Sequence, residues 1–149
     1  MGYYIEIVQS DAYISADKIE AACRGMEPMM QPDHVAKMGQ GGSWGGGERT
    51  AVWYSWVNDD DCRDLLAKND LAGFLEHWGF ETHTSNSDGA IYIQGYNSKT
   101  GQEEYMLQNL APFVAPNTMI MWRGEDGAMW ADAFDGEKMV EKNVKLVVE

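Results

Sequence analysis

Residues 118–136, TMIMWRGEDGAMWADAFDG, decide the fold of this chain. Apolar and aromatic residues dominate its two runs, and the dipeptides Asp126-Gly127 and Asp135-Gly136 that follow these runs are typical of tight hairpin turns. A third run of strand-forming residues lies beyond the second turn. The pattern predicts a three-stranded β-meander with the strands Thr118–Arg123, Ala128–Phe134 and Lys138–Val148.

Upstream of the meander, hydrophobic periodicity predicts helices and strands in alternation. The expected strands are Tyr3–Ile7, Val52–Val57 and a hairpin of Phe80–Thr84 with Ala90–Tyr96. The expected helices are Ala16–Gly25, a helical region from the Asp-rich segment at 59 to Trp78, and Gln102 to about Val114. Asn69-Asp70 can divide the second helix, and Pro112 is expected to disturb the last turn of the third. A polar turn is predicted at Asn97–Gly101.

The element order is therefore β-α-β-α-β-β-α-β-β-β, which is typical of the α+β class. We expect a single α+β domain over residues 1–149, with a mixed or antiparallel sheet and about three helices on one face of it. Residues 26–50 interrupt every periodicity with two prolines, Pro28 and Pro32, and a cluster of glycines between Gly39 and Gly47. This segment is predicted to be a mobile loop.

The net charge of −13 is the strongest compositional signal. It disfavours direct binding to nucleic acids or anionic membranes, because both are bound through basic residues. Carboxylates concentrate in two segments, Asp59–Asp70 and Glu125–Glu137. They form either a solvated, solubilising surface or a negative face that binds a partner protein with a basic surface. In the second case the partner-binding residues are Asp59, Asp60, Asp61, Asp64, Glu125, Asp126, Asp132, Asp135 and Glu137.

The sequence does not match the common motifs of catalytic, cofactor or metal sites, and the residues that break each motif can be named. The glycine cluster ends in Gly47-Glu48-Arg49, where a P-loop has Lys followed by Ser or Thr, and Trp44 stands where a dinucleotide fingerprint needs its third glycine. His77 and His83 lack the spacing of a zinc motif, and Asp132–Glu137 lacks that of a calcium loop and is expected to form a hairpin turn. We therefore predict no metal and no cofactor, and a binding protein rather than an enzyme.

The two cysteines, Cys23 and Cys62, both fall in expected helices and are too few for a disulfide framework. Cys62 stands among aspartates, whose negative charge disfavours a thiolate. The first residues contain neither the basic segment nor the continuous apolar run of a signal peptide. We expect free thiols in a soluble, cytoplasmic protein.

An aromatic pocket is the alternative site, for a small ligand or substrate. Its candidate lining is Trp44, Trp53, Trp56 and Arg123, and the glycine-rich loop is then either a lid or only a flexible connection. Arg123 lies in an aromatic strand that is expected to be half-buried. We expect it either to pair with a carboxylate of the following turn, Glu125 or Asp126, or to stack on a neighbouring tryptophan. Four methionines are expected to fill gaps in the core rather than to form a cofactor site: Met119, Met121, Met129 and Met139.

Several stretches resemble a group of small bacteriophage and prophage proteins of unknown function. They are GYYIEIVQSDAYISADKIEAA (2–22), GGSWGG (41–46), the aromatic run at 52–57, GYNSKTGQEEYMLQNLAPFV (95–114) and WRGEDGAMWADAFDGEKMVE (122–141). The resemblance covers most of the chain. It implies a phage or prophage origin, and hence the cytoplasm of a bacterial host, but it supplies no activity, catalytic residue or ligand.

The sequence thus predicts a non-enzymatic, acidic phage accessory protein that binds and occupies a host protein. One version of this partner is a nucleic-acid-binding component of host defence, because an acidic protein can compete for a basic groove and so act in counter-defence. A small-ligand binder or enzyme with the aromatic pocket is the first alternative. A structural or self-associating phage protein is the second.

Overall fold

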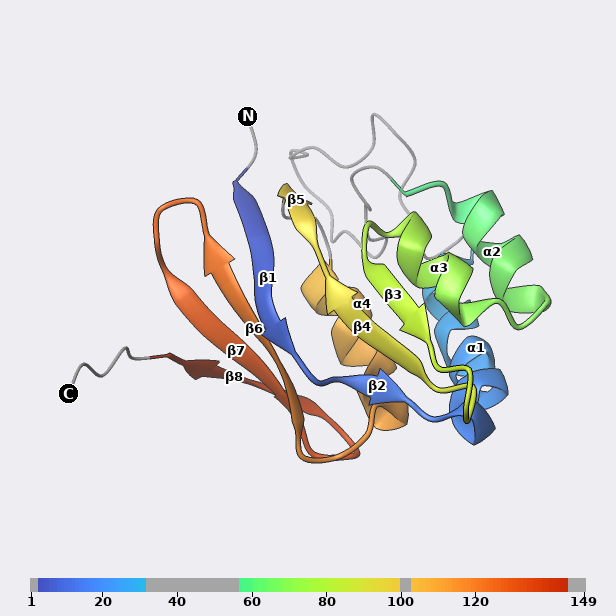
Figure 1. The fold of residues 1–149 in the computed structure, drawn as a ribbon. Coiled ribbons are helices and arrows are strands. Elements are labelled where there is room, and N and C mark those ends of the chain that lie inside the picture. The colour runs from blue at the N-terminus through green and yellow to red at the C-terminus, as the bar shows by residue number, and fades with distance from the viewer. Residues whose placement is uncertain (1–2, 32–56, 100–102, 145–149) are drawn as a thin grey trace.

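The computed structural model describes residues 3–31, 57–99 and 103–144, which form two antiparallel sheets and a set of helices (Figure 1). The larger sheet has the strand order β5-β1-β6-β7-β8. Buried and exposed side chains alternate along its central strand β6, as expected of a sheet with one face on the core. Its strands are β1 (Tyr4–Ser10), β5 (Asn97–Lys99), β6 (Thr118–Gly124), β7 (Met129–Phe134) and β8 (Met139–Asn143).

The smaller sheet has the order β2-β4-β3, with β2 at Tyr13–Ile14, β3 at Glu81–Thr84 and β4 at Ile91–Gly95. The chain passes twice between the sheets, from β1 to β2 and from β4 to β5. Backbone hydrogen bonds tie the two crossings together, from Ile7 N to the Tyr96 carbonyl and from Ile93 N to the Ala12 carbonyl. The two sheets therefore meet along a shared line of backbone hydrogen bonds.

The helices pack beside and behind this junction (Figure 1). They are α1 (Ile19–Met26), α2 (Asp59–Ala67), α3 (Leu71–His77) and α4 (Glu103–Leu110). Short 3-10 turns flank two of them, at Ala16–Lys18 and Glu27–Met30 around α1 and at Ala111–Phe113 after α4. Within the described ranges, none of the helices has the length and apolar character needed to cross a membrane.

An aromatic cluster joins the sheets at the centre of the core. The Trp122 ring meets those of Tyr96 and Phe80 edge-on, with ring centroids 5.6 and 6.2 Å apart, and stacks on Trp130 at 6.4 Å. Large aromatic side chains dominate core energetics, each adding about 2–3 kcal/mol when fully buried. This cluster fixes the inner face of β6 and β7, where the candidate site lies.

Most of the predicted elements are confirmed. The meander is β6-β7-β8, the hairpin is β3-β4, and the second helical region divides near Asn69-Asp70 into α2 and α3. The third helix changes to a 3-10 turn at Ala111–Phe113, as expected from Pro112. Both helices and antiparallel sheets are present, in agreement with the α+β class.

Other predictions were wrong. The strands form two sheets rather than one, and Asn97–Lys99 is strand β5 rather than part of a polar turn. The mobile loop was predicted to begin at Met26, but the 3-10 turn Glu27–Met30 continues from α1 because Met29 and Met30 are buried in the core. The predicted helix Ala16–Gly25 begins as the 3-10 turn Ala16–Lys18 and becomes α-helical only at Ile19. The predicted strand Val52–Val57, except for Val57, and the rest of the glycine-rich segment lie outside the described residues.

Candidate functional site

The carboxylates at the start of α2 serve the helix on which they lie. Asn58 caps this helix by accepting a hydrogen bond from Asp61 N at 3.1 Å. Asp59 and Asp60 form ion pairs with Arg63 one turn later, the first at 2.8 Å. Negative charge at a helix N-terminus also stabilises the helix dipole. Asp64 points away from the core and is exposed.

The carboxylates in the two hairpin turns hold the turns together. Glu125 accepts a hydrogen bond from Tyr4 N at 2.8 Å. Asp126 accepts hydrogen bonds from the Tyr3 hydroxyl and from Ala128 N, which keep the pKa of its carboxyl below the ordinary value. The pKa of Asp135 is likewise lowered, because it accepts from the backbone N–H groups of Lys138 and Glu137 at 2.8 and 2.9 Å.

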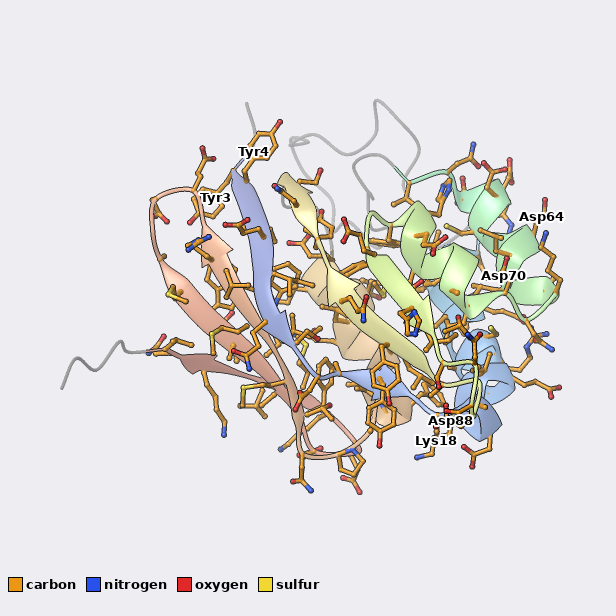
Figure 2. All side chains as sticks on the ribbon, in the orientation of Figure 1. Tyr3, Tyr4, Lys18, Asp64, Asp70 and Asp88 are labelled. Carbon is orange, nitrogen blue, oxygen red and sulfur yellow. The ribbon has the colours of Figure 1, made fainter. Side chains whose placement is uncertain are left out.

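These acidic groups do not gather on one face. The β6–β7 turn and the β7–β8 turn lie at opposite ends of β7, a strand of six residues and so about 20 Å long. The helix α2 lies on the far side of the smaller sheet from both turns (Figure 1). In Figure 2, Asp64 stands on that outer helix, whereas Tyr3, the partner of Asp126, stands at the start of β1.

Asp132 differs from every other acidic residue of the predicted set. It lies inside β7, within the predicted strand Ala128–Phe134, but it is only 3% exposed and so is not part of the exposed acidic surface in which it was expected. Its Oδ2 accepts a hydrogen bond from Trp122 Nε1 at 2.8 Å. Its Oδ1 is buried and has no hydrogen-bond partner among the residues that the structure describes. An unsatisfied buried carboxylate oxygen is costly, so this atom needs an explanation.

Asp132 lines a hollow of about 100 Å³ that opens between α4 and the inner face of the larger sheet. We name it the carboxylate hollow. Three further acidic residues and three apolar or aromatic ones complete its lining. Its residues are Ile5 of β1, Glu103 and Glu104 of α4, Trp122 of β6, Trp130 and Asp132 of β7, and Glu141 of β8.

Strand register assembles the hollow from distant parts of the sequence. Trp122 lies directly opposite Trp130, and Asp132 directly opposite Glu141. Alternation along β7 places Trp130, Asp132 and Phe134 on the same side of the sheet. Glu103, in the first turn of α4, is 6% exposed and stands over this face.

The electrostatics of the hollow favour a cation. Burial raises the pKa of Asp132 to about 7, against the opposing effect of the Trp122 hydrogen bond, and the negative charges of Glu104, Glu141 and Glu103 raise it further. Each of these causes would be relieved by a positive charge beside Oδ1. Across residues 3–31, 57–99 and 103–144, no group of three or more His, Cys, Asp or Glu side chains has the geometry to hold a metal ion.

The predicted aromatic pocket is only partly placed. Trp44, Trp53 and Trp56 lie outside the described residues. Arg123 is an exposed residue of β6, a strand with one buried face as predicted. It pairs with Glu6 on the adjacent strand, with Nε 2.9 Å from Oε1, rather than with Glu125 or Asp126. It lines a second, shallow hollow of about 180 Å³ with Glu6, Asn97, Glu125 and their neighbours on β1 and β6.

Two further predictions concern sulfur-containing residues. Met119 is 40% exposed on the outer face of the larger sheet, so its expected core role is wrong, whereas Met139 packs against the core. Cys23 and Cys62 are free and buried in helices, as expected. Burial raises the pKa of Cys62 to about 12, and the charges of Asp61 and Asp59 add to the shift.

Comparison with known proteins adds nothing to this geometry. No protein-family model, no curated protein and no solved structure matches the chain. The site must therefore be interpreted from its own residues.

Asp132 was predicted in a strand and in the acidic set but was treated as an exposed carboxylate, and Glu103, Glu104 and Glu141 were missed. The signal that identifies Asp132 is its spacing in WADAF, two residues from Trp130 and two from Phe134. In a strand this spacing places a carboxylate on the same side as two large aromatic residues. The three glutamates carry no comparable signal, because only the register of β8 and the position of α4 bring them to Asp132.

Proposed function

We propose that this protein is an acidic accessory protein that binds a partner protein with a basic surface, and that the carboxylate hollow receives a positively charged side chain of the partner. The observation that carries the proposal is Asp132 Oδ1, a buried carboxylate oxygen to which none of the described residues donates a hydrogen bond, on a residue that lines the hollow together with three other acidic residues. A lysine or arginine side chain supplies both the missing hydrogen bond and the missing positive charge.

The net charge of −13 supports the same type of partner. A strongly negative molecule attracts a basic surface over a distance of about one Debye length and accelerates encounter. The exposed carboxylates of α2 and of the hairpin turns contribute to this attraction from several sides. They do not define a docking face, so specificity in this proposal comes from the hollow.

A host protein is the partner that the resemblance to phage proteins suggests. A nucleic-acid-binding defence component fits the chemistry, since its groove presents the lysine and arginine side chains that normally contact phosphates. The same hollow also favours a second candidate function, binding of a free small amine, because about 100 Å³ is a small space that a compact cation can fill.

Matched variants test the proposal. Asp132→Asn removes the buried charge but keeps the shape of the side chain, and Asp64→Asn removes an equal charge from the exposed surface of α2. Each protein is immobilised and exposed to a bacterial lysate at low and at physiological salt. We expect at least one protein to be retained by the wild type and by Asp64→Asn, and to be lost with Asp132→Asn.

Zero-length carbodiimide crosslinking then identifies the contact. We expect crosslinks between lysines of the retained protein and Glu104 or Glu141, the two exposed carboxylates of the hollow. Equal retention by both variants, or crosslinks confined to α2 and the hairpin turns, would show that the hollow is not the binding site. A retained protein with no dependence on salt would argue against an electrostatic partner.

A further inference from the structure

The hydrogen-bond acceptors of the carboxylate hollow indicate which type of cation it binds. Oδ2 of Asp132 already accepts a hydrogen bond from the indole N–H of Trp122 at 2.8 Å. The other oxygen, Oδ1, is buried and receives no hydrogen bond from any residue that the structure describes, so it is the oxygen with its full acceptor capacity left for a ligand. We propose that the hollow is selective for a primary ammonium group, such as that of a lysine side chain, over a guanidinium group.

Donor geometry explains the selectivity. A guanidinium group binds a carboxylate best through two parallel N–H donors, which require both oxygens to be available. At Asp132 the second of these donors would have to share Oδ2 with the indole N–H of Trp122, which weakens the two-donor arrangement. Of the five donors of a guanidinium, those that miss Oδ1 would need acceptors in a narrow space. A primary ammonium has three donors, of which one meets Oδ1 and the others face the carboxylates at the rim, Glu104 and Glu141.

The size and walls of the hollow agree with this assignment. A space of about 100 Å³ equals the volume share of roughly three water molecules at about 30 Å³ each. That is enough for an ammonium group and the methylene next to it. The rings of Trp122 and Trp130 provide apolar walls for the methylene stem of a lysine. Their π-systems also attract a cation.

The proton state of Asp132 couples to this binding. An ammonium pairs with the ionised carboxylate, whereas the neutral acid at lower pH offers little attraction. The charged groups that act on Asp132 are the negative Glu103 and Glu104 from α4 and Glu141 from β8. The residue that faces it from β6 is the neutral Trp122, which donates a hydrogen bond to it. With three glutamates opposing ionisation, a bound cation should favour it, so ammonium binding should strengthen as pH rises from 6 to 8.

The inference rests on the proposed function, and small probes separate the two. The full chain, labelled with ¹⁵N, is titrated with n-butylammonium, n-butylguanidinium and n-butyltrimethylammonium chloride at constant ionic strength. The indole N–H signal of Trp122, assigned by triple-resonance spectra, reports directly on the other oxygen of Asp132. Butyltrimethylammonium carries the same charge and stem but has no N–H donor, so it isolates the hydrogen bond.

We expect butylammonium to shift the Trp122 indole signal in a saturable way, with a dissociation constant at least tenfold below that of either other probe. The shift should disappear in Asp132→Asn and persist in Asp64→Asn. Equal or tighter binding of butylguanidinium would overturn the selectivity, and absence of any saturable shift at pH 8 would overturn the site itself.

Failure of the inference and failure of the proposed function give different results. If the probes fail while Asp132→Asn still loses a captured protein, the partner uses the hollow without a primary ammonium. If butylammonium binds but Asp132→Asn and the wild type capture the same proteins, the hollow is a small-amine site and the proposed protein partner is wrong.

Discussion

Replacing Asp132 with asparagine should change the pH dependence of stability in a direction opposite to that expected for a carboxylate whose pKa is lowered by an ion pair or hydrogen bonds. The pKa of this carboxyl is raised from 3.8 to about 7 in the folded protein, chiefly by burial. The folded state therefore holds the proton more tightly than the unfolded state does. The contribution of this group to stability is fully present below the unfolded pKa and is lost progressively as pH rises towards the folded pKa.

The magnitude follows from these two pKa values. Between pH 5.5 and pH 8.5 the loss is about 2 kcal/mol, and the total loss from acid pH to pH 8.5 is about 4 kcal/mol, at about 1.4 kcal/mol per pKa unit. Asparagine does not titrate, so Asp132→Asn should lack this slope. Its amide can keep the hydrogen bond from Trp122 Nε1 by presenting its oxygen to the indole. The variant should thus gain about 2 kcal/mol on the wild type over this pH range.

Urea unfolding followed by tryptophan fluorescence measures this difference. The range from pH 5.5 upwards keeps the protein away from its isoelectric point near 4.4, where association would interfere. At an m-value of about 2 kcal/mol/M, the midpoint difference between variant and wild type should change by about 1 M across the range. Asp64→Asn is the control and should follow the wild type. If Asp132→Asn also runs parallel to the wild type within about 0.5 kcal/mol, the raised pKa, and with it the electrostatic basis of the hollow, is wrong.

Three other perturbations test the surrounding structure. Burial raises the pKa of the Cys23 thiol to about 11 and that of the Cys62 thiol to about 12. Iodoacetamide at pH 8 should therefore modify neither cysteine in the native protein and both in urea, as measured by intact mass. Rapid modification of the native protein would contradict their burial. Asn58→Ala removes the side-chain acceptor for Asp61 N and should lower the free energy of unfolding by about 1 kcal/mol, whereas Asn86→Ala, in an exposed loop, should change it by less than about 0.5 kcal/mol. Gly79→Ala should cost about 1–2 kcal/mol in urea unfolding, because Gly79 has φ +105° and an added Cβ would lie 3.1 Å from the Tyr96 ring; an unchanged midpoint would show that this turn relaxes freely.

Local sequence signals account for the elements that were predicted correctly. The meander was predictable because aromatic and β-branched runs alternate with Asp-Gly turns, and both turn glycines, Gly127 and Gly136, adopt positive φ as such turns require. The division between α2 and α3 was predictable because Asn69 and Asp70 favour a break. Asn69 adopts a positive φ, and Asp70 caps α3 by accepting a hydrogen bond from Gly73 N at 2.9 Å.

The errors arise where tertiary pairing overrides local preference. Asn97–Lys99 is polar and turn-like in sequence, yet β1 supplies an edge to which it adds as strand β5. The two-residue strand β2 exists only because β4 lies beside it, with Tyr13 opposite Tyr92. Likewise the carboxylate hollow depends on the register of β7 with β8 and on the placement of α4. The sequence could identify acidic residues, but it could not show that one of them is buried while the others are exposed or form caps and turns.

The free-energy cost of ionising Asp132 in the folded protein is an argument for a ligand. At pH 8.5 the ionised carboxylate lowers the stability of the empty protein by about 4 kcal/mol, and a neutral polar residue of similar shape would avoid this loss. A cation that pairs with Oδ1 and relieves the repulsion from the surrounding glutamates can recover up to the same amount, which corresponds to about a thousandfold in affinity from a single side chain. On this reasoning, specific binding does not require a continuous acidic face. In the proposed binding mode, the exposed carboxylates of α2 and of the hairpin turns would accelerate the approach of a basic partner, and the buried carboxylate of Asp132 would select the side chain that enters the hollow.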